Sequence, residues 1–437
     1  MHLVLGFGDT GASFLRYLKT KNLPFLIMDS RTNPPGLSQF KSLNKKHLSL
    51  GSFDEDILDK VKSVLVSPGI SFNNKVLKRA RKLGIEVETD IDIFLKETKS
   101  KTILITGTNG KTTVVNMVYN QLKEVYGEDR VISCGNIGKP VLDTLSSKSQ
   151  ISVIEVSSFH LEHSKDLKCD ISVLLNVDQD HLDRHESIER YLKIKQKILS
   201  NSQVALVGEN NLIPSFLSRK NIFNFQELLK PFEKEILDLM GKHWPFHDLF
   251  NFKAVLAVYL ALTNKHKLLK LKKIKRQDLE LFFRHKNISA VFTRLPHRYE
   301  ILGKKEGVTY INDSKGTNLL SLEAALKSSK KLYGKERVLL LCGGDLKNQD
   351  LSRISLGCLD SLKHIFSFGK DRKKITEALQ DKVECTIVKD LGQALDNAKS
   401  LSKKGDVIML SPACASTDMF KDYKDRGDKF KKIAGFV

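Results

Sequence analysis

Short apolar runs alternate along the chain with polar stretches that have helical spacing. Near the N-terminus the apolar runs are HLVLGF (2–7), PFLIMDS (24–30) and SVLVSPG (63–69), and the segment GDTGASFLRYLKT after the first run has the character of a helix. Buried strands that alternate with helices predict a parallel sheet with helices on its faces.

The same alternation restarts near residue 98. KTILITGT (101–108) is a predicted strand that runs into a glycine-rich loop, and a helix is expected from Lys111. Further strands are predicted at RVISCG, SVIEVSS and DISVLLNV, and the apolar spacing of 186–200 predicts another helix. Residues 209–245 have no clear period, so no element is predicted there.

A third unit follows TRLPHRYE (293–300), with predicted strands at VTYIND, RVLLLCGG, HIFSFG and DVIMLSPA. We therefore predict an α/β protein of three domains. These are a Rossmann-like N-terminal domain (1–97), a central parallel-sheet domain of the P-loop ATPase type (98–292) and a Rossmann-like C-terminal α/β domain (293–437).

The composition is that of a globular protein, with 41% apolar and 28% charged residues. No signal-peptide pattern and no membrane-spanning apolar stretch are present in the sequence, so we expect no membrane insertion. The cysteines show no CxxC pairing, which favours buried reduced thiols over disulfides or a zinc site and therefore predicts a protein of the reducing cytoplasm. They are Cys134, Cys169, Cys342, Cys358, Cys385 and Cys414.

The charge is strongly basic, with 72 Lys and Arg against 51 Asp and Glu, a net +21. Such a charge favours anionic partners. The segment 264–277 concentrates lysines, but no aromatic residue interleaves them. A solvated, lysine-rich helix face is therefore the preferred interpretation over a nucleic-acid patch.

Two glycine-rich turns are candidate phosphate sites. In GFGDTG, the glycines 6, 8 and 11 follow a predicted strand, and Asp29 ends the next one. This pattern fits a bound nucleotide diphosphate, although a tight turn requires the same residues. In ITGTNGKTT (105–113), two residues separate Gly107 from the Gly-Lys-Thr ending, two fewer than in the standard P-loop. Backbone N–H groups, Lys111 and Thr112 there predict a nucleoside triphosphate site with Mg²⁺.

Acidic and histidine residues lie downstream of this loop. Glu155 stands inside an apolar strand, where a carboxylate needs a partner or a metal ion. Asp180, His181, Asp183 and His185 follow another strand end. The segment has no HExxH glutamate, so a magnesium site beside the triphosphate is favoured over a zinc hydrolase centre.

Together these residues resemble the Mur ligase family, the ATP-dependent amide-forming enzymes of peptidoglycan precursor synthesis. The resemblance runs nearly end to end, and the shortened loop is the usual form in that family. The motifs that carry it are TGTNGKTT, GNIG (135–138), EVSSF (155–159), LNVDQDHLDRH, LPHRYE (295–300), NDSKGTN (312–318), GGDLK (343–347) and SPACASTDMF (411–420).

The resemblance implies a mechanism and a set of catalytic residues. A substrate carboxylate attacks the γ-phosphate of ATP, and an amino-acid amine then displaces phosphate from the acyl phosphate. Lys111 is implied to hold the β- and γ-phosphates, Thr112 and Glu155 one Mg²⁺ ion, and His181 to lie near a second. Other implied ATP-binding residues are Gly107, Thr108, Asn109, Gly110, Thr113, Asn251, Arg298 and Asp313.

Lys195 matches the lysine that the family carbamylates with CO₂, which would convert a cation into a carboxylate-like metal ligand. The residues alone do not distinguish Lys195 from Lys193 or Lys197. Carbamylation needs the neutral amine and hence a depressed lysine pKa.

Within the family, the chain is most similar to members that add D-glutamate to UDP-N-acetylmuramoyl-L-alanine. The implied UDP-substrate residues are Thr10, Ser30, Arg31 and Asn136. The implied D-glutamate residues are Lys315, Thr317, Lys347, Ser416 and Tyr423. A monomer with no obligatory nucleic acid is expected.

Three departures from the family pattern bear on specificity rather than on the reaction. Asp248 stands where an asparagine is usual, His160 where glutamine is common, and Tyr423 where phenylalanine lines the D-glutamate pocket.

Alternative functions share part of the pattern. A Mur ligase for another amino acid, or a folylpolyglutamate synthetase, would have the same loop and lysine, but GGDLK, SPACAS and the first domain favour D-glutamate. The +21 charge motivates a nucleic-acid-dependent NTPase, and GFGDTG motivates a nicotinamide oxidoreductase.

Overall fold

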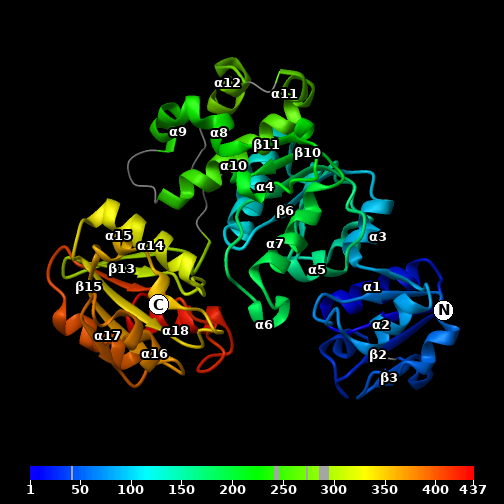
Figure 1. Cartoon of the computed structure of the whole chain (residues 1–437), viewed down its shortest axis with the longest axis horizontal. Helices are drawn as coiled ribbons and strands as arrows, with labels where there is room; N and C mark the ends of the chain where they lie inside the picture. Colours follow the sequence, from blue (N-terminus) through cyan, green and yellow to red (C-terminus); the bar gives the residue numbers. More distant parts are fainter. Residues whose placement is uncertain (41–42, 241–245, 272–273, 285–294) are drawn as a thin grey trace. The chain divides into compact units, whose positions relative to one another are not determined.

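The computed structural model describes residues 1–40, 43–240, 246–271, 274–284 and 295–437 (Figure 1). The chain divides into two compact units. The first comprises Met1–Val177, Glu189–Lys230 and Lys253–Val291, and the second comprises Asp178–Ile188, Pro231–Phe252 and Phe292–Val437. The predicted α/β class is confirmed: the described residues form two sheets in the first unit and one in the second.

The N-terminal sheet is entirely parallel. Its strands are His2–Leu5 (β1), Phe25–Asp29 (β2), Leu48–Leu50 (β3), Ser63–Val66 (β4) and Glu86–Glu88 (β5), in the order β3-β2-β1-β4-β5. The helices are Asp9–Thr20 (α1), Lys75–Lys82 (α2) and Asp90–Glu97 (α3), with 3-10 turns at Pro35–Gln39, Lys45–His47 and Asp56–Lys60. This strand order is that of a Rossmann-like half, with the glycine turn between β1 and α1.

Burial on both faces explains the continuous apolar runs in this sheet. Along β1, Leu3 and Leu5 pack in one cluster with α2. Val4 packs in the other cluster with Phe14 of α1, and that cluster continues into the central sheet. The first two sheets therefore share one hydrophobic core.

The central sheet is also parallel, with strands Lys101–Thr106 (β6), Val131–Gly135 (β7), Ile151–Glu155 (β8), Cys169–Leu174 (β9), Ser202–Val207 (β10) and Ile222–Asn224 (β11). Their order is β11-β10-β9-β6-β8-β7. The helices of this part of the chain are Lys111–Tyr126 (α4), Ser158–His163 (α5), Leu182–His185 (α6), Ile188–Gln196 (α7), Phe225–Leu229 (α8), Glu233–Met240 (α9), Phe246–Thr263 (α10), Lys265–Leu271 (α11) and Arg276–Arg284 (α12). Its 3-10 turns are Glu128–Arg130, Val141–Thr144, Lys197–Leu199, Asn210–Leu212, Arg219–Asn221 and Lys230–Phe232.

The C-terminal sheet has the order β12-β13-β17-β14-β15-β16. Its strands are Glu300–Lys305 (β12), Val308–Asn312 (β13), Val338–Gly343 (β14), Leu362–Phe368 (β15), Cys385–Ile387 (β16) and Val407–Leu410 (β17). The helices are Leu319–Tyr333 (α14), Leu356–Leu359 (α15), Arg372–Leu379 (α16), Leu391–Leu401 (α17) and Tyr423–Ile433 (α18), with a 3-10 turn at Leu351–Arg353. Clusters on the two faces of the sheet include α14 and α16 on one side and α17 and α18 on the other.

Several elements escaped the sequence prediction. Strand β12 pairs antiparallel with β13 at the sheet edge, and its EILGKK sequence has no long apolar run because none of its residues is fully buried. Residues 209–240 form only short elements, none longer than the eight residues of α9, so no period develops. The predicted Lys-rich helix face falls partly on α11, where Leu268 is buried.

The cysteines are unpaired thiols in the structure, and all but the half-buried Cys385 are buried. Burial raises the pKa of Cys134 to about 12. None of the helices in the described part of the chain is both long and apolar enough to cross a bilayer.

Candidate active site

The shortened glycine loop lies where β6 ends and α4 begins, at the carboxyl edge of the parallel sheet. Gly110 precedes the helix with φ +82°, a left-handed conformation that glycine adopts without strain. Asn176, just past β9, pins the loop: its side-chain oxygen accepts from the Asn109 N–H at 2.9 Å, and its backbone oxygen accepts from the Thr108 N–H at 2.9 Å. A glycine turn that precedes a 16-residue helix is of the kind that binds phosphate oxygens.

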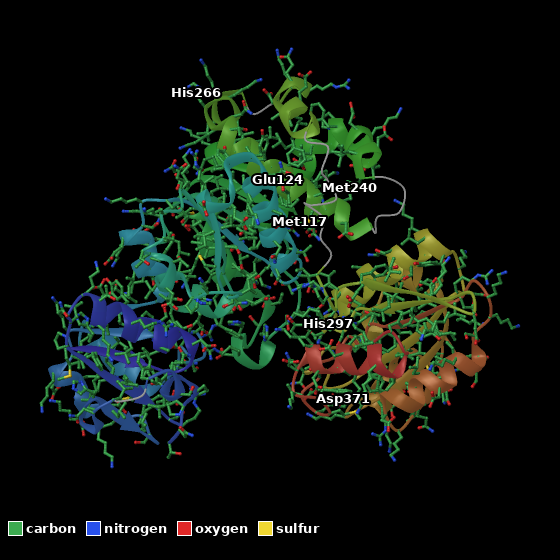
Figure 2. All side chains as sticks on the ribbon, turned by 180° about the vertical axis from the view of Figure 1, so that it is seen from behind. Met117, Glu124, Met240, His266, His297 and Asp371 are labelled. Atoms are coloured by element: carbon green, nitrogen blue, oxygen red, sulfur yellow. The ribbon has the colours of Figure 1, made fainter. Side chains whose placement is uncertain are left out.

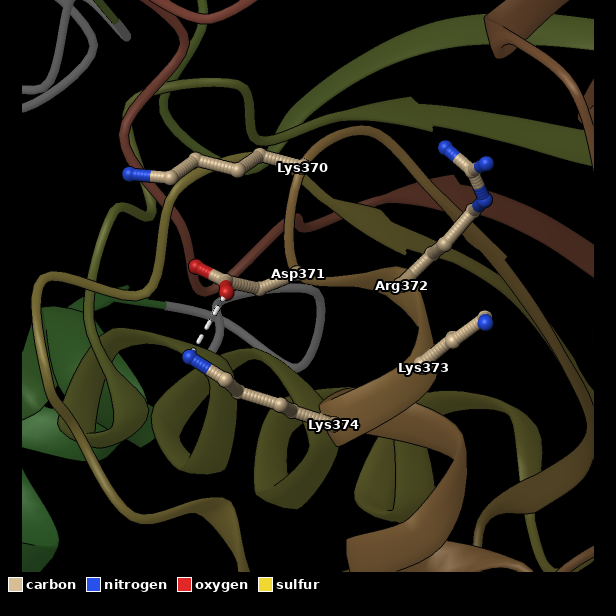
Figure 3. A pocket seen from close by; sticks show the side chains of 5 residues that line it. All are labelled: Lys370, Asp371, Arg372, Lys373 and Lys374. Atoms are coloured by element: carbon tan, nitrogen blue, oxygen red, sulfur yellow. Dashed lines mark ion pairs between the residues drawn. The ribbon is translucent and has the colours of Figure 1, made fainter.

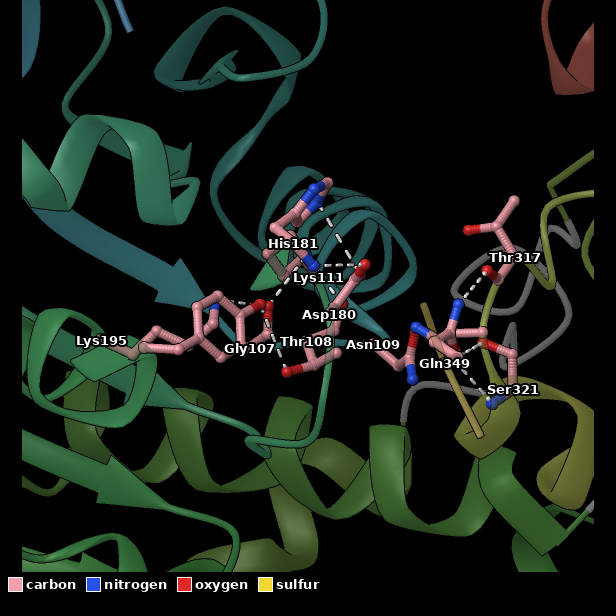
Figure 4. Close-up of polar contacts among 12 residues, drawn as sticks. Gly107, Thr108, Asn109, Lys111, Asp180, His181, Lys195, Thr317, Ser321 and Gln349 are labelled. Carbon is pink, nitrogen blue, oxygen red and sulfur yellow. Dashed lines mark hydrogen bonds and ion pairs between the residues drawn. The ribbon is translucent and has the colours of Figure 1, made fainter. Parts of the chain in front are cut away.

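Two lysine ammonium groups converge on this loop (Figure 4). Lys111 Nζ donates to the carbonyl oxygens of Gly107 at 2.8 Å and Thr108 at 2.9 Å. Lys195 Nζ, from α7, donates to the same Gly107 oxygen at 2.8 Å and contacts Thr106 Oγ1 at 3.4 Å. Lys195 is 1% exposed, so of the lysines in YLKIKQK it is the one that the fold buries at the loop.

Glu155 ends β8, which pairs with β6 so that Glu155 lies opposite Ile105. The carboxylate is 1% exposed. Its Oε1 accepts from Asn136 Nδ2 at 2.8 Å, and its Oε2 is buried without a hydrogen-bond partner in the structure as described. A buried carboxylate oxygen that lacks a donor fits a cation ligand, and Mg²⁺ prefers such oxygens.

No group of three or more His, Cys, Asp and Glu side chains that could hold a metal ion occurs among the described residues. Mg²⁺ commonly takes one or two protein carboxylates and completes its shell with water and phosphate oxygens. Glu155 beside the glycine loop fits that pattern, whereas a protein-only cage of zinc type does not.

A cleft of about 660 Å³ lies in the first unit, between the N-terminal and central sheets. All four residues predicted for the UDP-substrate line it: Thr10, Ser30, Arg31 and Asn136. The buried Asp29 holds Arg31 through Nε–Oδ1 at 2.9 Å and Nη2–Oδ2 at 2.7 Å, and also accepts from the Phe7 N–H. Burial alone would raise the pKa of Asp29, but these hydrogen bonds lower it below its usual value. Asp29 thus orients Arg31 in the cleft.

His160 also lines this cleft. It is buried on α5, with Nδ1 2.6 Å from Ser157 Oγ and Nε2 3.8 Å from the Asp90 carboxylate. Burial lowers the pKa of His160 to about 4 and raises the pKa of Asp90 to about 7. Both groups are therefore neutral in the folded protein between about pH 4 and 7.

This pair has a testable effect on stability. Between pH 6.5 and 4 the unfolded chain gains a proton at His160, so that group makes stability fall as pH falls. Between pH 3.8 and 7 the folded chain keeps the Asp90 proton, so that group makes stability fall as pH rises. The two contributions oppose each other, so His160→Gln should leave only the contribution of Asp90. In that variant we expect the free energy of unfolding to fall by about 1 kcal/mol per pH unit as the pH is raised from 5 to 6.5.

Urea unfolding of both proteins across that pH range measures the slopes. Adding Asp90→Asn to His160→Gln should flatten the profile again. A His160→Gln protein with the same pH profile as the unchanged protein would contradict the opposed-pair explanation.

In the second unit, His181 follows the end of β9 by several residues and has φ +51°. Its N–H donates to Asp180 Oδ1 at 2.9 Å, and its Nε2 lies 3.7 Å from Asp180 Oδ2. His185 is fully buried, and the side chain of Asp183 lies outside the described residues. Asn251 and Asp248 are both buried near the start of α10.

Arg298 lies in a turn between two left-handed residues, His297 at φ +65° and Tyr299 at φ +43°. Non-glycine residues persist in that region only where surrounding contacts hold them. Here Asp313 Oδ1 accepts from the Tyr299 N–H at 3.0 Å, while Asp313 Oδ2 accepts from Ser411 Oγ at 2.7 Å. Asp313 thus fixes the turn that presents Arg298.

The residues predicted for D-glutamate all belong to the C-terminal domain. Lys315 Nζ lies 4.1 Å from the centre of the Tyr423 ring, a cation–π contact. The Thr317 carbonyl accepts from Gln349 Nε2 at 3.3 Å (Figure 4). Lys347 is in the left-handed region at φ +49°, and Ser416 is 4% exposed.

Arg426, which the sequence analysis missed, ties three loops of this domain together. Fully buried on α18, it donates to Ser314 Oγ at 3.0 Å and to the carbonyls of Ser314 at 2.8 Å, Gly343 at 3.2 Å and Cys414 at 3.0 Å. Burial lowers its pKa to about 10, so it keeps its charge. An arginine in a polar helix stretch looks exposed in sequence, and only the fold reveals its burial.

We expect Arg426→Met to lower the free energy of unfolding by about 3 kcal/mol, because buried carbonyls lose their donors. Urea unfolding followed by circular dichroism measures the change. Lys424→Met, at an exposed position of the same helix, is the matched control and should stay within about 0.5 kcal/mol. Equal midpoints for the two variants would contradict the structural role of Arg426.

Matches to known families cover most of the chain. Residues 1–89 match the description "Mur ligase MurD-like, N-terminal domain", residues 105–225 match "Mur ligase middle domain", and residues 297–414 match "Mur ligase, glutamate ligase domain".

Individual proteins agree with these matches. The UDP-N-acetylmuramoylalanine--D-glutamate ligase of Shewanella oneidensis is 34% identical over 449 residues, covering 98% of this chain and 97% of that protein. The protein of the same name from Marinobacter nauticus is 33% identical, and the match covers 99% of this chain and 97% of that protein. A solved structure, the UDP-N-acetylmuramate-alanine ligase of Thermotoga maritima, shares the fold at a TM-score of 0.54 and 17% identity, covering 99% of each chain. The resemblance seen in the sequence motifs is confirmed, and the chain belongs to the Mur ligase family.

Proposed function

We propose that this protein is an ATP-dependent ligase that joins D-glutamate to UDP-N-acetylmuramoyl-L-alanine in peptidoglycan precursor synthesis. The observation that carries the ligase chemistry is the buried Glu155, with one unfilled oxygen, on the strand next to the strand that feeds the lysine-bearing loop. The choice of D-glutamate is supported by the name of the full-length relatives.

The glycine loop is the proposed triphosphate site. Backbone N–H groups of residues 107–113 and the Lys111 ammonium bind phosphate oxygens, and Asn251, Arg298 and Asp313 are further proposed ATP-binding residues. Mg²⁺ would be held by Thr112 and Glu155, with His181 and a carbamate on Lys195 as ligands for a second ion. Bound there, Mg²⁺ would neutralise negative charge on the phosphates.

The cleft of the first unit is the proposed UDP-substrate site. It is lined by residues of the GFGDTG turn and by Arg31, a cation that its contacts with Asp29 hold in place. A diphosphate fits this combination of backbone N–H groups and a guanidinium. Each oxygen of Asp29 already accepts two hydrogen bonds from the protein, which argues against their use on the ribose of a nicotinamide dinucleotide.

In the C-terminal domain, Lys315, Thr317, Lys347, Ser416 and Tyr423 are the proposed residues for D-glutamate. Two cationic side chains and two hydroxyls suit a dicarboxylate. We further propose that residues 1–97, 98–292 and 293–437 bind the UDP-substrate, ATP and the amino acid respectively, in a monomeric cytoplasmic protein.

The proposed reaction has two steps. The carboxylate oxygen of the UDP-substrate attacks the γ-phosphorus, and the bond to ADP breaks. The amine of D-glutamate then attacks the acyl carbon, loses a proton and expels phosphate. Because two anions meet in the first step, cationic side chains and fixed N–H groups lower its barrier.

Phosphate release from ATP with Mg²⁺ and UDP-N-acetylmuramoyl-L-alanine tests the proposal. D-glutamate, L-glutamate, L-lysine and D-Ala-D-Ala are supplied separately. We expect release only with D-glutamate, together with a product heavier by one glutamate residue. Release with another amino acid would keep the ligase and contradict the substrate, and release that needs only DNA or RNA would contradict both.

A further inference from the structure

One loop of the C-terminal domain has no proposed substrate contact, yet it holds in place two neighbouring loops that carry proposed substrate contacts. This clamp loop, residues 369–371, follows β15. The neighbouring loops carry Lys347 after β14 and Ser416 after β17, and the three strands lie side by side in the order β17-β14-β15. The carboxyl ends of these parallel strands meet at one edge of the sheet.

Asp371 is the last residue of the clamp loop (Figure 3). Its side chain is 8% exposed, and Figure 2 labels it within the C-terminal domain. Oδ2 accepts from the Leu346 N–H at 2.9 Å, and the Asp371 N–H donates to the Gly344 carbonyl at 3.1 Å. Oδ1 pairs with Lys374 Nζ at 3.0 Å. Asp371 therefore grips the backbone immediately before Lys347.

The rest of the clamp loop reaches both substrate-binding loops. The Lys370 N–H donates to Asp418 Oδ2 at 2.9 Å, two residues after Ser416. Lys370 Nζ donates to Asp345 Oδ2 at 2.7 Å, while Asp345 Oδ1 accepts from the Lys347 N–H at 2.8 Å. At Gly369, φ is +79° and a Cβ would lie 2.8 Å from both Asp418 Oδ2 and Gly344 N, so only glycine permits this approach.

The backbone that these contacts hold is strained. Lys347 and Asn348 have φ of +49° and +63°, the left-handed region that non-glycine residues rarely adopt. Two such residues in succession require fixed neighbours on each side. On the N-terminal side these neighbours are the Leu346 and Lys347 N–H groups, held by Asp371 and Asp345.

We infer that Asp371 is a positioning residue, which fixes the strained turn at Lys347 and thereby the geometry of the amino-acid site. The inference rests on the proposed function, because it takes Lys347 as a substrate contact. Asp371 itself touches no substrate in this assignment. Its removal should weaken amino-acid binding while sparing the sites for ATP and the UDP-substrate.

Steady-state kinetics of Asp371→Ala test this role. We expect the KM for D-glutamate to rise about tenfold, because Leu346 N–H loses its buried acceptor, with kcat and the KM for ATP within about threefold. Asp371→Asn keeps an acceptor oxygen and should rescue the KM to within about twofold. Asp390→Ala is the matched control: it removes an Asp acceptor from the Gln393 N–H at the start of α17 and should leave the KM unchanged.

Hydrogen–deuterium exchange provides a readout that needs no substrate. In Asp371→Ala, peptides covering 344–348 should exchange faster than in the unchanged protein and in Asp390→Ala. Asp418→Ala, which alters an exposed residue, should speed exchange in 415–420 and serves if Asp371→Ala fails to fold. Unchanged exchange in both clamp variants, or an unchanged KM in folded Asp371→Ala, would overturn the inference. If the unchanged protein uses another amino acid, the D-glutamate assignment fails, and the KM comparison is made with that amino acid.

Discussion

Replacing Lys195 with alanine should lower the rate of phosphate release about a thousandfold. The amine is buried at the glycine loop and shares the Gly107 carbonyl with Lys111. Two ammonium groups at one carbonyl oxygen repel each other, which supports the proposed conversion of the buried Lys195 into an anionic carbamate. Alanine removes the group that would carry this carbamate and its metal-binding oxygens.

A carboxylate from an added small acid or from a glutamate side chain should partly replace the proposed Lys195 carbamate. We expect acetate or formate to restore some activity to Lys195→Ala, and Lys195→Glu to retain more than Lys195→Ala. Lys193→Ala is the matched control, because Lys193 is exposed on the same helix. Full activity of Lys195→Ala without any additive would refute the carbamate role.

Glu155→Gln should lower activity about a hundredfold or more and raise the Mg²⁺ concentration needed for half-maximal rate. In the absence of Mg²⁺, the same substitution should increase the free energy of unfolding, because a buried carboxylate with an unfilled oxygen costs more than a buried amide. If Glu155 instead stabilised the core, the same substitution would lower the free energy of unfolding. The Mg²⁺ dependence of activity and the stability without Mg²⁺ together therefore distinguish a metal ligand from a core residue.

Mg²⁺ titration of activity and urea unfolding in EDTA measure these two effects. Glu162→Gln is the control, because Glu162 is also buried, on α5, and has no proposed metal contact. An unchanged Mg²⁺ dependence in Glu155→Gln, or a loss of stability without the metal ion, would argue against the proposed ligand role.

The strands at the centre of each sheet were predictable because both of their faces are buried. β1, β6 and β14 are near-continuous apolar runs, and the glycine turns after β1 and β6 mark their ends. The edge strand β12 was not predictable, since an exposed antiparallel strand needs few apolar residues. A local hydrophobic pattern indicates burial. It does not predict a strand that forms because it pairs with a neighbouring strand at the sheet edge.

For the site, sequence motifs indicated the phosphate loop and the acid of β8, while the supporting contacts were hidden. Asn176 follows an apolar strand as an ordinary polar residue, yet it pins the glycine loop. Asp371 stands in the charged run KDRKK, which looks like a solvated surface, yet its carboxylate is buried against Leu346 N–H. Such residues act through partners that are remote in sequence, and no local pattern records them.

The amino-acid sequence alone was enough to predict the α/β class, the order of the strands along the chain and a candidate phosphate loop, because hydrophobic period and glycine spacing are local properties. The folded structure was needed to show which lysine of YLKIKQK is buried at the loop, which oxygen of Glu155 lacks a donor, and which loops the clamp residues join. Burial and hydrogen bonding are relations between distant segments, and these arise only when parallel strands bring their carboxyl ends to a common edge.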